Sequence, residues 1–256
     1  MVRQRIKRLI PVLRKNRIVI RSPGMVILFD IDGTLIDHDA AEVIAIAALR
    51  RKIEHTEDAA GFLRRWRSAF ERHYNSYLAG ELSIQQQRRE RFREVFDPNL
   101  SDSAADQLSA FYIHEYLAAC ELYSDVQAAL AELAGYPMGI ISNGERSQQQ
   151  HKLVRTGIDH YFGPLILSGE CGVAKPAPRI FELACDSMGV VPSKAVYIGD
   201  RPDVDAAAAR SVGMHGIWLD RHGASHDGDP RSRIGSLSAL PGAISLIQQN
   251  SRREYA

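Results

Sequence analysis

The stretch GMVILFDIDGTLIDHD, residues 24–39, decides how the rest of the chain is interpreted. Its apolar run from Met25 to Phe29 is typical of a buried strand. The run ends abruptly in two acids, a glycine and a threonine (Asp30, Asp32, Gly33 and Thr34). Two carboxylates this close together repel each other, so a ligand of opposite charge is expected at the end of the strand.

Two simpler interpretations of these acids compete with a ligand site. A surface turn with solvated carboxylates would need no ligand. A calcium loop requires the pattern D-x-[DN]-x-[DN]-G, but Thr34 and Leu35 occupy the positions that need Asp or Asn and then Gly. The calcium loop is therefore excluded, and the surface turn remains open at this point.

Length and composition are those of a soluble globular protein. The chain has 256 residues, 45% of them hydrophobic and 25% charged, which is enough to bury a substantial core. No apolar run reaches the ~18 residues of a membrane span, so we expect no membrane partner. No two of the three cysteines form a CxxC pair, which favours reduced thiols and a cytoplasmic location (Cys120, Cys171 and Cys185).

Charge is distributed unevenly along the chain. The net charge is +1, yet residues 1–24 hold eight Lys or Arg and no acid, so the remainder is acidic. An acidic body argues against a nucleic-acid polymer as a partner. We expect residues 1–24 to be a disordered basic extension, or to precede a true start at Met25.

Hydrophobic spacing divides the chain after the first strand into two blocks. In the first block, apolar residues at three-and-four spacing predict helices at 39–53, 58–79, 83–95 and 102–119. Asp39, followed three residues later by Glu42, is expected to begin the first of these helices.

In the second block, helices and strands alternate. Strands are expected at 137–142, 164–168, 194–200 and 215–220, and helices at 124–134, 145–156, 177–188, 203–212 and 237–249. Short strands that are apolar on both faces, separated by helices, predict an α/β fold with a Rossmann-like, doubly wound parallel sheet. The strand at 25–30 belongs to that sheet, so an all-helical block is inserted after it.

Polar residues follow four of the predicted strands. They are Asp30 to Thr34, Ser142-Asn143, Lys175-Pro176 and Gly199 to Asp205. In open parallel sheets, ligands bind beyond the carboxyl ends of the strands. The four sets together predict one phosphate and magnesium site at this rim, whereas the surface-turn interpretation accounts for each set only separately.

Each residue type has a physical role in such a site. Mg²⁺ prefers oxygen ligands, and Asp30 and Asp200 offer carboxylates from separate strands. Asp30 is also placed to attack phosphorus. Asp32 points the same way as Asp30 and could act first as an acid and then as a base. Contacts to the phosphoryl oxygens, including the positive charge of the lysine, are expected from five residues (Gly33, Thr34, Ser142, Asn143 and Lys175).

In this order the four motifs resemble those of haloacid dehalogenase superfamily phosphatases, over residues 25–220. The resemblance implies a catalytic core at 25–38 and 120–249, a helical C1 cap at 39–119 and a tail at 250–256. It also implies roles for the acids. Asp30 would be the nucleophile, Asp32 the acid and base, and Mg²⁺ would be held by Asp30, the Asp32 carbonyl and Asp200. Asp205 would be a supporting acid, although Asp203 competes for that assignment.

A finer likeness concerns YLAGELSIQQQRRERF, ISNGERSQQQHKL and SGECGVAKPAPRIFELA, which resemble the pyrimidine 5′-nucleotidase and N-acylneuraminate-9-phosphatase branch. It implies a small phosphomonoester substrate, a nucleotide or a sugar phosphate. Four cap arginines could meet the distal groups of such a substrate, although a solvated helix face is the commoner interpretation (Arg88, Arg89, Arg91 and Arg93). We expect all nine histidines to be structural or superficial.

Several alternatives stay open. Haloacid dehalogenases lack an acid at the position of Asp32, so its presence favours phosphate esters over carbon–halogen bonds. A sugar phosphomutase of the β-phosphoglucomutase type shares that acid and a helical cap, and only its product would distinguish it. A non-enzymatic interaction protein is the third class, and full cellular function of an Asp30→Asn variant would favour it. The chain is expected to be a monomer or a homodimer.

Overall fold

The computed structural model describes residues 24–54, 56–223, 229 and 231–253. The expected basic extension at 1–24 lies outside the described residues apart from Gly24, as do residues 254–256 of the expected tail. None of the described helices combines the length and the hydropathy that crossing a membrane requires.

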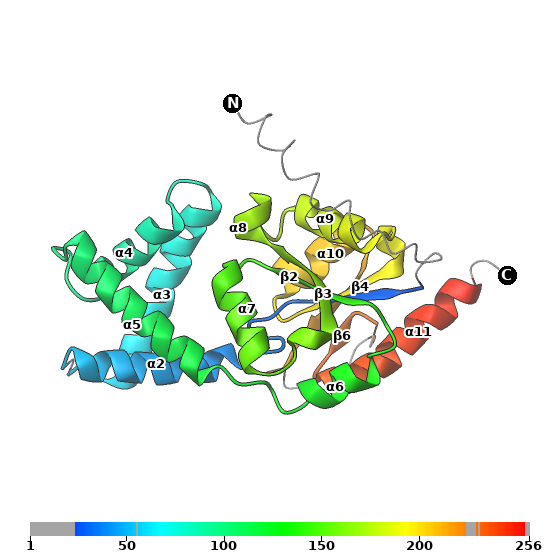
Figure 1. Ribbon diagram of the computed structural model, residues 1–256, viewed down its shortest axis with the longest axis horizontal. Helices are drawn as coiled ribbons and strands as arrows, with labels where there is room; N and C mark the ends of the chain where they lie inside the picture. Colours follow the sequence, from blue (N-terminus) through cyan, green and yellow to red (C-terminus); the bar gives the residue numbers. More distant parts are fainter. Residues whose placement is uncertain (1–23, 55, 224–228, 230, 254–256) are drawn as a thin grey trace.

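A parallel sheet of six strands forms the centre of the molecule (Figure 1). In chain order they are β1 (Val26–Phe29), β2 (Met138–Ser142), β3 (Phe162–Leu167), β4 (Ala195–Gly199), β5 (His215–Leu219) and β6 (Arg233–Ile234). Across the sheet the order is β3-β2-β1-β4-β5-β6. The order reverses at β1, whose carboxyl end is therefore the point where such sheets bind ligands. The predicted α/β, doubly wound fold is confirmed.

Both faces of the sheet are covered, which explains the unbroken apolar run in β1. Ile27 and Phe29 belong to an apolar cluster with α6 (Val126–Glu132), α7 (Arg146–Arg155) and α11 (Leu240–Arg253). Val26 and Leu28 belong to a second cluster with α9 (Pro178–Met188) and α10 (Ala208–Ser211). Figure 1 shows these two sets of helices on opposite sides of the strands. Every side chain of β1 is buried, so none is free to be polar.

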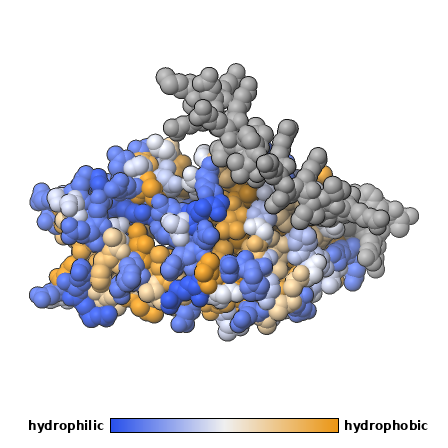
Figure 2. Space-filling model, viewed as in Figure 1, coloured by the Kyte–Doolittle hydropathy of each residue, from blue (hydrophilic) through white to orange (hydrophobic). Residues whose placement is uncertain are grey.

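Four helices stand between β1 and β2 in the chain and form a lobe beside the sheet (Figure 1). They are α2 (His38–Lys52), α3 (Ala59–Leu78), α4 (Ile84–Val95) and α5 (Asp102–Ala119). Trp66 lies at the centre of the lobe, with its ring 5.3 Å from that of Phe92 and 4.7 Å from that of Tyr112. On the face seen in Figure 2, the upper part of this lobe is mostly hydrophilic. The lobe thus has an apolar interior of its own.

The predicted start of the first inserted helix was wrong. The side chain of Asp37 caps α2 by accepting a hydrogen bond from the backbone N–H of Ala40 at 3.0 Å. Asp39 and Glu42 instead accept hydrogen bonds from the guanidinium of Arg67 on α3. The acids that resembled a cap therefore join two helices of the lobe.

Several elements differ from the sequence-based expectation. The helix predicted at 203–212 is a π-helix at Pro202–Ala207 followed by α10. The sixth strand, β6, was not predicted, and neither was the short helix α8 (Ser168–Cys171). The last helix runs from Leu240 to Arg253 instead of ending at 249. Short 3₁₀ turns occupy Asp159–Tyr161, Pro192–Lys194 and Leu237–Ala239.

Candidate active site

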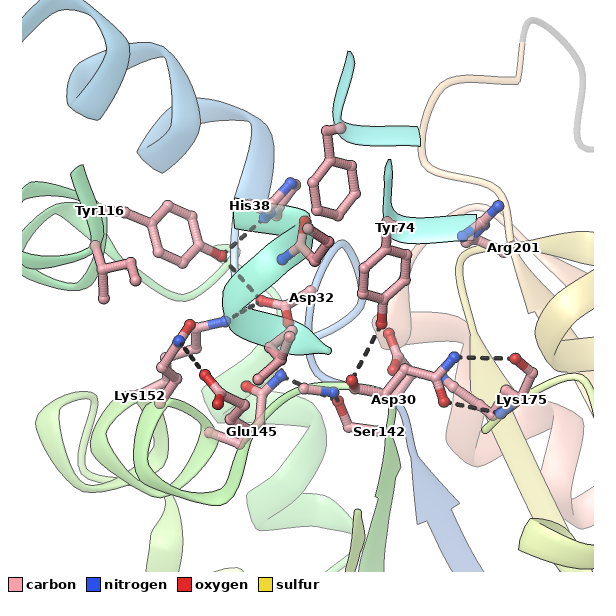
Figure 3. Close-up of a pocket in the computed structure, with 18 of the residues that line it drawn as sticks. Asp30, Asp32, His38, Tyr74, Tyr116, Ser142, Glu145, Lys152, Lys175 and Arg201 are labelled. Carbon is pink, nitrogen blue, oxygen red and sulfur yellow. Dashed lines mark hydrogen bonds and ion pairs between the residues drawn. The ribbon is translucent and has the colours of Figure 1, made fainter. Parts of the chain in front are cut away.

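A cavity of about 290 Å³ lies between the carboxyl ends of β1, β2 and β4 and the inserted helices α3, α4 and α5. Seven of the residues expected in the phosphate and magnesium site line it (Asp30, Asp32, Ser142, Asn143, Lys175, Asp200 and Asp205). Figure 3 shows Asp30 and Lys175 on one side of the cavity and Asp32 on the other. The strand ends thus meet at one place, as the topology requires.

Asp30 and Lys175 form a buried ion pair at the floor of the cavity. The Nζ of Lys175 donates to Oδ1 of Asp30 at 2.6 Å, to Oδ1 of Asp205 at 2.7 Å and to the hydroxyl of Tyr197 at 2.9 Å. The two acids hold the pKa of the Lys175 ammonium above its usual range even though burial alone would lower it. Lys175 therefore keeps a permanent positive charge beside Asp30.

One lysine does not balance the acids around it. Burial, with smaller contributions from the charges of Asp205 and Asp200, raises the pKa of Asp30 to about 8 against the lowering effect of Lys175. Burial also raises the pKa of Asp200 to about 6, with Asp205 adding to the rise. Oxygens of Asp30, Asp200 and Asp205 all lie within 4.8 Å of one another. A divalent cation that takes oxygen ligands fits this surplus of negative charge.

The structure separates the two candidates for the supporting acid. Asp205 is buried, and its Oδ1 and Oδ2 accept hydrogen bonds from Lys175 and from the backbone N–H of Arg201. Asp203 is exposed on the outer side of the π-helix. Since the oxygens of Asp205 are already engaged, Asp30 and Asp200 are the carboxylates best placed to hold a metal.

Asp32 faces Asp30 across the cavity and is held by hydrogen bonds from three side chains. Its Oδ1 accepts from Lys152 at 2.5 Å and from the Tyr116 hydroxyl at 3.0 Å, and its Oδ2 accepts from Gln149 at 2.8 Å. His38 lies within 2.8 Å of the same Tyr116 hydroxyl. Burial alone would raise the pKa of Asp32, but Lys152 and His38 hold it below its usual range. Asp32 is thus a carboxylate fixed in position, and it must take up a proton before it can act as an acid.

Ser142 and Asn143 have different environments although they are adjacent. The Ser142 hydroxyl accepts from the backbone N–H of Gly144 and from Gln149, and among the described residues it has no acceptor for its own proton. The side chain of Asn143 is hydrogen-bonded to the backbone of Lys175. It accepts from the backbone N–H of Lys175 at 2.8 Å and donates to the Lys175 carbonyl at 2.9 Å. The geometry suits Ser142 to binding a phosphoryl oxygen and Asn143 to positioning Lys175.

Gly33 and Thr34 lie behind the cavity wall and do not line it. Gly33 has a φ of 81°, and a Cβ built on it would stand 2.4 Å from Oδ2 of Asp200. Thr34 is fully buried, and its hydroxyl donates to Oδ2 of Asp30 over 3.4 Å. Both residues therefore influence the positions of the acids, and neither of them contacts the cavity.

Of the four cap arginines, two point away from the cavity. Arg89 donates to Asp106 at 2.6 Å and Arg93 donates to Asp102 at 2.5 Å, which makes both part of ion pairs between α4 and α5. Arg88 and Arg91 line the cavity. Arg88 donates to Glu145 at the start of α7 and so joins the lobe to the core.

Sequence reasoning missed several residues of the cavity, notably Lys152, Tyr116, Tyr74 and His38. Tyr74 of α3 donates to the backbone carbonyl of Asn143 at 3.1 Å. Lys152 is 2% exposed, on the buried face of α7. The sequence does contain a signal for Lys152. Gln149, Lys152 and Leu153 follow helical spacing and share the buried face of α7, where a lysine is unusual. The prediction that all nine histidines are structural or superficial did not foresee that His38 lines the cavity.

A family model for haloacid dehalogenase-like hydrolases matches residues 25–213. The chain belongs to this family. It is 38% identical over 120 residues to a phosphoserine phosphatase of Thermus thermophilus, covering 45% of this chain and 48% of that protein. It is 25% identical over 234 residues to human N-acylneuraminate-9-phosphatase, covering 86% and 94%. The chain spans about half the length of the first of these relatives, as it does of a glyceraldehyde 3-phosphate phosphatase from Methanopyrus kandleri.

Among solved structures, the fold is similar to that of the haloacid dehalogenase-like hydrolase YfnB from Bacillus subtilis, whose crystals hold magnesium. The TM-score is 0.77 at 17% sequence identity, and the match covers 88% of this chain and 100% of the other. This likeness concerns the fold alone. Together with the family match, it confirms the resemblance that the four motifs indicated.

Proposed function

We propose that this protein is a Mg²⁺-dependent phosphatase that hydrolyses phosphomonoesters of small metabolites through a phosphoryl group carried on Asp30. The observation that supports it most is the opposition of Asp30 and Asp32 across one cavity. Asp30 is paired with a permanent cation, and Asp32 is a separately fixed carboxylate. One acid can then attack phosphorus while the other moves protons.

The first step transfers the phosphoryl group to the protein. A carboxylate oxygen of Asp30 forms a bond to phosphorus as the bond to the ester oxygen breaks. Asp32, carrying a proton, gives it to the departing oxygen and becomes ionised. Lys175 and the Ser142 hydroxyl stabilise the negative charge that spreads over the other phosphoryl oxygens. The hydrogen bonds from Lys152, Tyr116 and Gln149 to Asp32 favour the ionised form that this step leaves behind.

The second step removes the phosphoryl group. Asp32 takes a proton from a water molecule, whose oxygen attacks phosphorus and releases inorganic phosphate and the Asp30 carboxylate. The proton gained from water is the one that Asp32 donates in the next turnover, so the cycle is balanced. Mg²⁺, held by Asp30, Asp200 and the Asp32 carbonyl, would neutralise charge on the phosphoryl oxygens. We propose further that residues 39–119 act as a cap that excludes water during both steps.

The proposed substrates are small. A cavity of about 290 Å³ lies at the lower end of the range for metabolite and cofactor sites. The relatives named above include phosphatases of phosphoserine and of N-acylneuraminate 9-phosphate. Small phosphorylated metabolites are therefore the substrate class that we propose.

The test is release of inorganic phosphate by the wild-type chain and by Asp30→Asn, with Mg²⁺ present. We expect release by the wild type and a loss of at least about 10³-fold in the variant, because an amide is a poor nucleophile toward phosphorus. Asp203→Asn is the matched control, because Asp203 is exposed and should be dispensable. Full activity of Asp30→Asn would refute the mechanism. Conversion of a sugar phosphate into its isomer, without phosphate release, would favour the phosphomutase.

A further inference from the structure

Arg91 stands out among the cations of the cavity. It is 5% exposed, lines the cavity, and has no ion pair or hydrogen bond from its guanidinium within the described residues. Its Nε is buried without any acceptor. A buried charge without a partner destabilises the fold, so its presence in a cavity indicates a role in binding a ligand of opposite charge.

Every other buried or half-buried cation of the cavity already has an acid beside it. Lys175 is paired with Asp30 and Asp205, Lys152 with Asp32, and Arg88 with Glu145. Arg201 also lines the cavity but is exposed at its rim. Arg91 is therefore the buried cation whose charge is not yet matched by a neighbour among the described residues.

Aromatic rings hold the Arg91 guanidinium in place. Its central carbon lies 4.3 Å from the ring centre of Trp66, 5.3 Å from that of Tyr112 and 5.4 Å from that of Phe70. Rings stabilise a guanidinium through its flat face, whereas its N–H bonds lie in its plane. The stacked group is thus fixed in orientation and keeps donors for a planar acceptor.

The charge of Arg91 persists at neutral pH. Burial, with a smaller contribution from Arg88, lowers its pKa to about 10, while Tyr112 and Glu42 act in the opposite direction. Glu42 does not quench the charge, because its carboxylate is paired with Arg67 at 2.6 Å. One helical turn before Arg91 on α4, the Oε1 of Gln87 is also buried without a donor. The same face of α4 therefore offers both a free cation and a free acceptor.

We propose that Arg91 binds a carboxylate on the part of the substrate distant from the scissile phosphate, so that the substrate class is phosphorylated carboxylic acids. This proposal rests on the phosphatase function above. A carboxylate matches a guanidinium in charge and in the spacing of its two oxygens. A second phosphate carries a charge of about −1.5 to −2, which is more than one guanidinium neutralises.

The test compares substrates that differ in the carboxylate. We would measure kcat/KM for 3-phosphoglycerate, glycerol 3-phosphate and p-nitrophenyl phosphate, using the wild type, Arg91→Met and Arg89→Met. Met keeps an unbranched apolar stem like that of the arginine and removes a buried charge, so Arg91→Met should fold. Arg89 is on the same helix but pairs with Asp106 outside the cavity, so Arg89→Met is the matched control.

We expect the wild type to prefer 3-phosphoglycerate to glycerol 3-phosphate by on the order of 100-fold, and Arg91→Met to abolish that preference. Hydrolysis of p-nitrophenyl phosphate should stay within about 3-fold in both variants, because that ester has no carboxylate. An equal loss on all three esters would overturn the proposal, since Arg91 would then serve the phosphoryl group or the fold. A preference for a bisphosphate over 3-phosphoglycerate would also overturn it.

A binding measurement separates this proposal from the phosphatase function. The fluorescence of Trp66, which stacks on Arg91, would be titrated with 3-phosphonopropionate and with propylphosphonate, neither of which can be hydrolysed. We expect the carboxylated ligand to bind about 100-fold more tightly to the wild type and equally to Arg91→Met. This result without any phosphate release would refute the phosphatase and retain the carboxylate site. Equal affinities in the wild type would refute the carboxylate site.

Discussion

A single glycine positions one of the metal-binding candidates. Gly33 has a positive φ and its Cα hydrogen faces the carboxylate of Asp200. Gly33→Ala should cost about 1–2 kcal/mol of unfolding free energy through its backbone, and should lower kcat/KM on the order of 100-fold by moving Asp200. Gly172 also has a positive φ of 68° but open space around it. Gly172→Ala should therefore lose similar stability in urea and keep its activity; an equal loss of activity in both variants would contradict this account.

Lys152 is expected to position Asp32 for proton transfer. Lys152→Met should lower kcat by about 10²-fold for alkyl phosphates, because their leaving oxygen needs a proton. The loss should be much smaller for p-nitrophenyl phosphate, whose leaving group is a weak base. Lys194→Met, which changes an exposed lysine, is the control. If the two kinds of ester lost activity to the same extent, Lys152 would have only a structural role.

At the residue scale, the sequence indicated the acids and missed their partners for a physical reason. Asp30, Asp32 and Asp200 closely follow β1 and β4, where local pattern alone determines which rim they reach. Lys175 follows the short helix α8 after β3 and reaches the same rim. Tyr116 and Arg91 belong to helices whose rotation relative to the sheet no local pattern determines. Arg89 and Arg91 are almost adjacent in the chain, yet one is paired outside and the other lines the cavity. Only the packing of α4 separates them.

At the element scale, the lobe and the core meet through a few polar contacts. Tyr74 of α3 donates to the carbonyl of Asn143 at the end of β2. One hydrogen bond contributes about 0.5–1.5 kcal/mol, so Tyr74→Phe should raise KM by about 2- to 10-fold with kcat nearly unchanged. Tyr77→Phe is the matched control, because the Tyr77 hydroxyl has no hydrogen bond in the described part of the chain. A KM that does not change in Tyr74→Phe would show that this contact does not hold the lobe.

Helices and strands were predictable from the sequence where the periodic pattern of apolar residues extended over several turns. The helices of the lobe lie within about two residues of their predicted ends, because each carries several turns of amphipathic pattern. The strand β6 has two residues, too few to show any period. The π-helix at Pro202–Ala207 places Asp205 within 2.7 Å of Lys175, a contact between distant parts of the chain. Such short or bent elements depend on their neighbours rather than on their own sequence.

At the scale of the whole molecule, the acidic cluster links metal binding to stability. Mg²⁺ should raise the melting temperature of the metal-free protein, since a ligand present at 100 times its Kd stabilises the fold by about 2.7 kcal/mol. Asp200→Asn should weaken this response, and Asp203→Asn should retain it. Chelation with EDTA should abolish phosphate release, and added Mg²⁺ should restore it. If Mg²⁺ did not change the melting temperature, the proposed role of the metal would be contradicted.

The central claim is that Asp30 carries the phosphoryl group during turnover. The most direct test mixes the wild-type protein with substrate and Mg²⁺, stops the reaction in acid within milliseconds, and locates phosphate by mass spectrometry of the peptide that contains residues 24–39. The account predicts phosphate on Asp30 before phosphate release becomes linear, and none in Asp30→Asn. Phosphate release at full rate from a protein that never carries phosphate on Asp30 would contradict it.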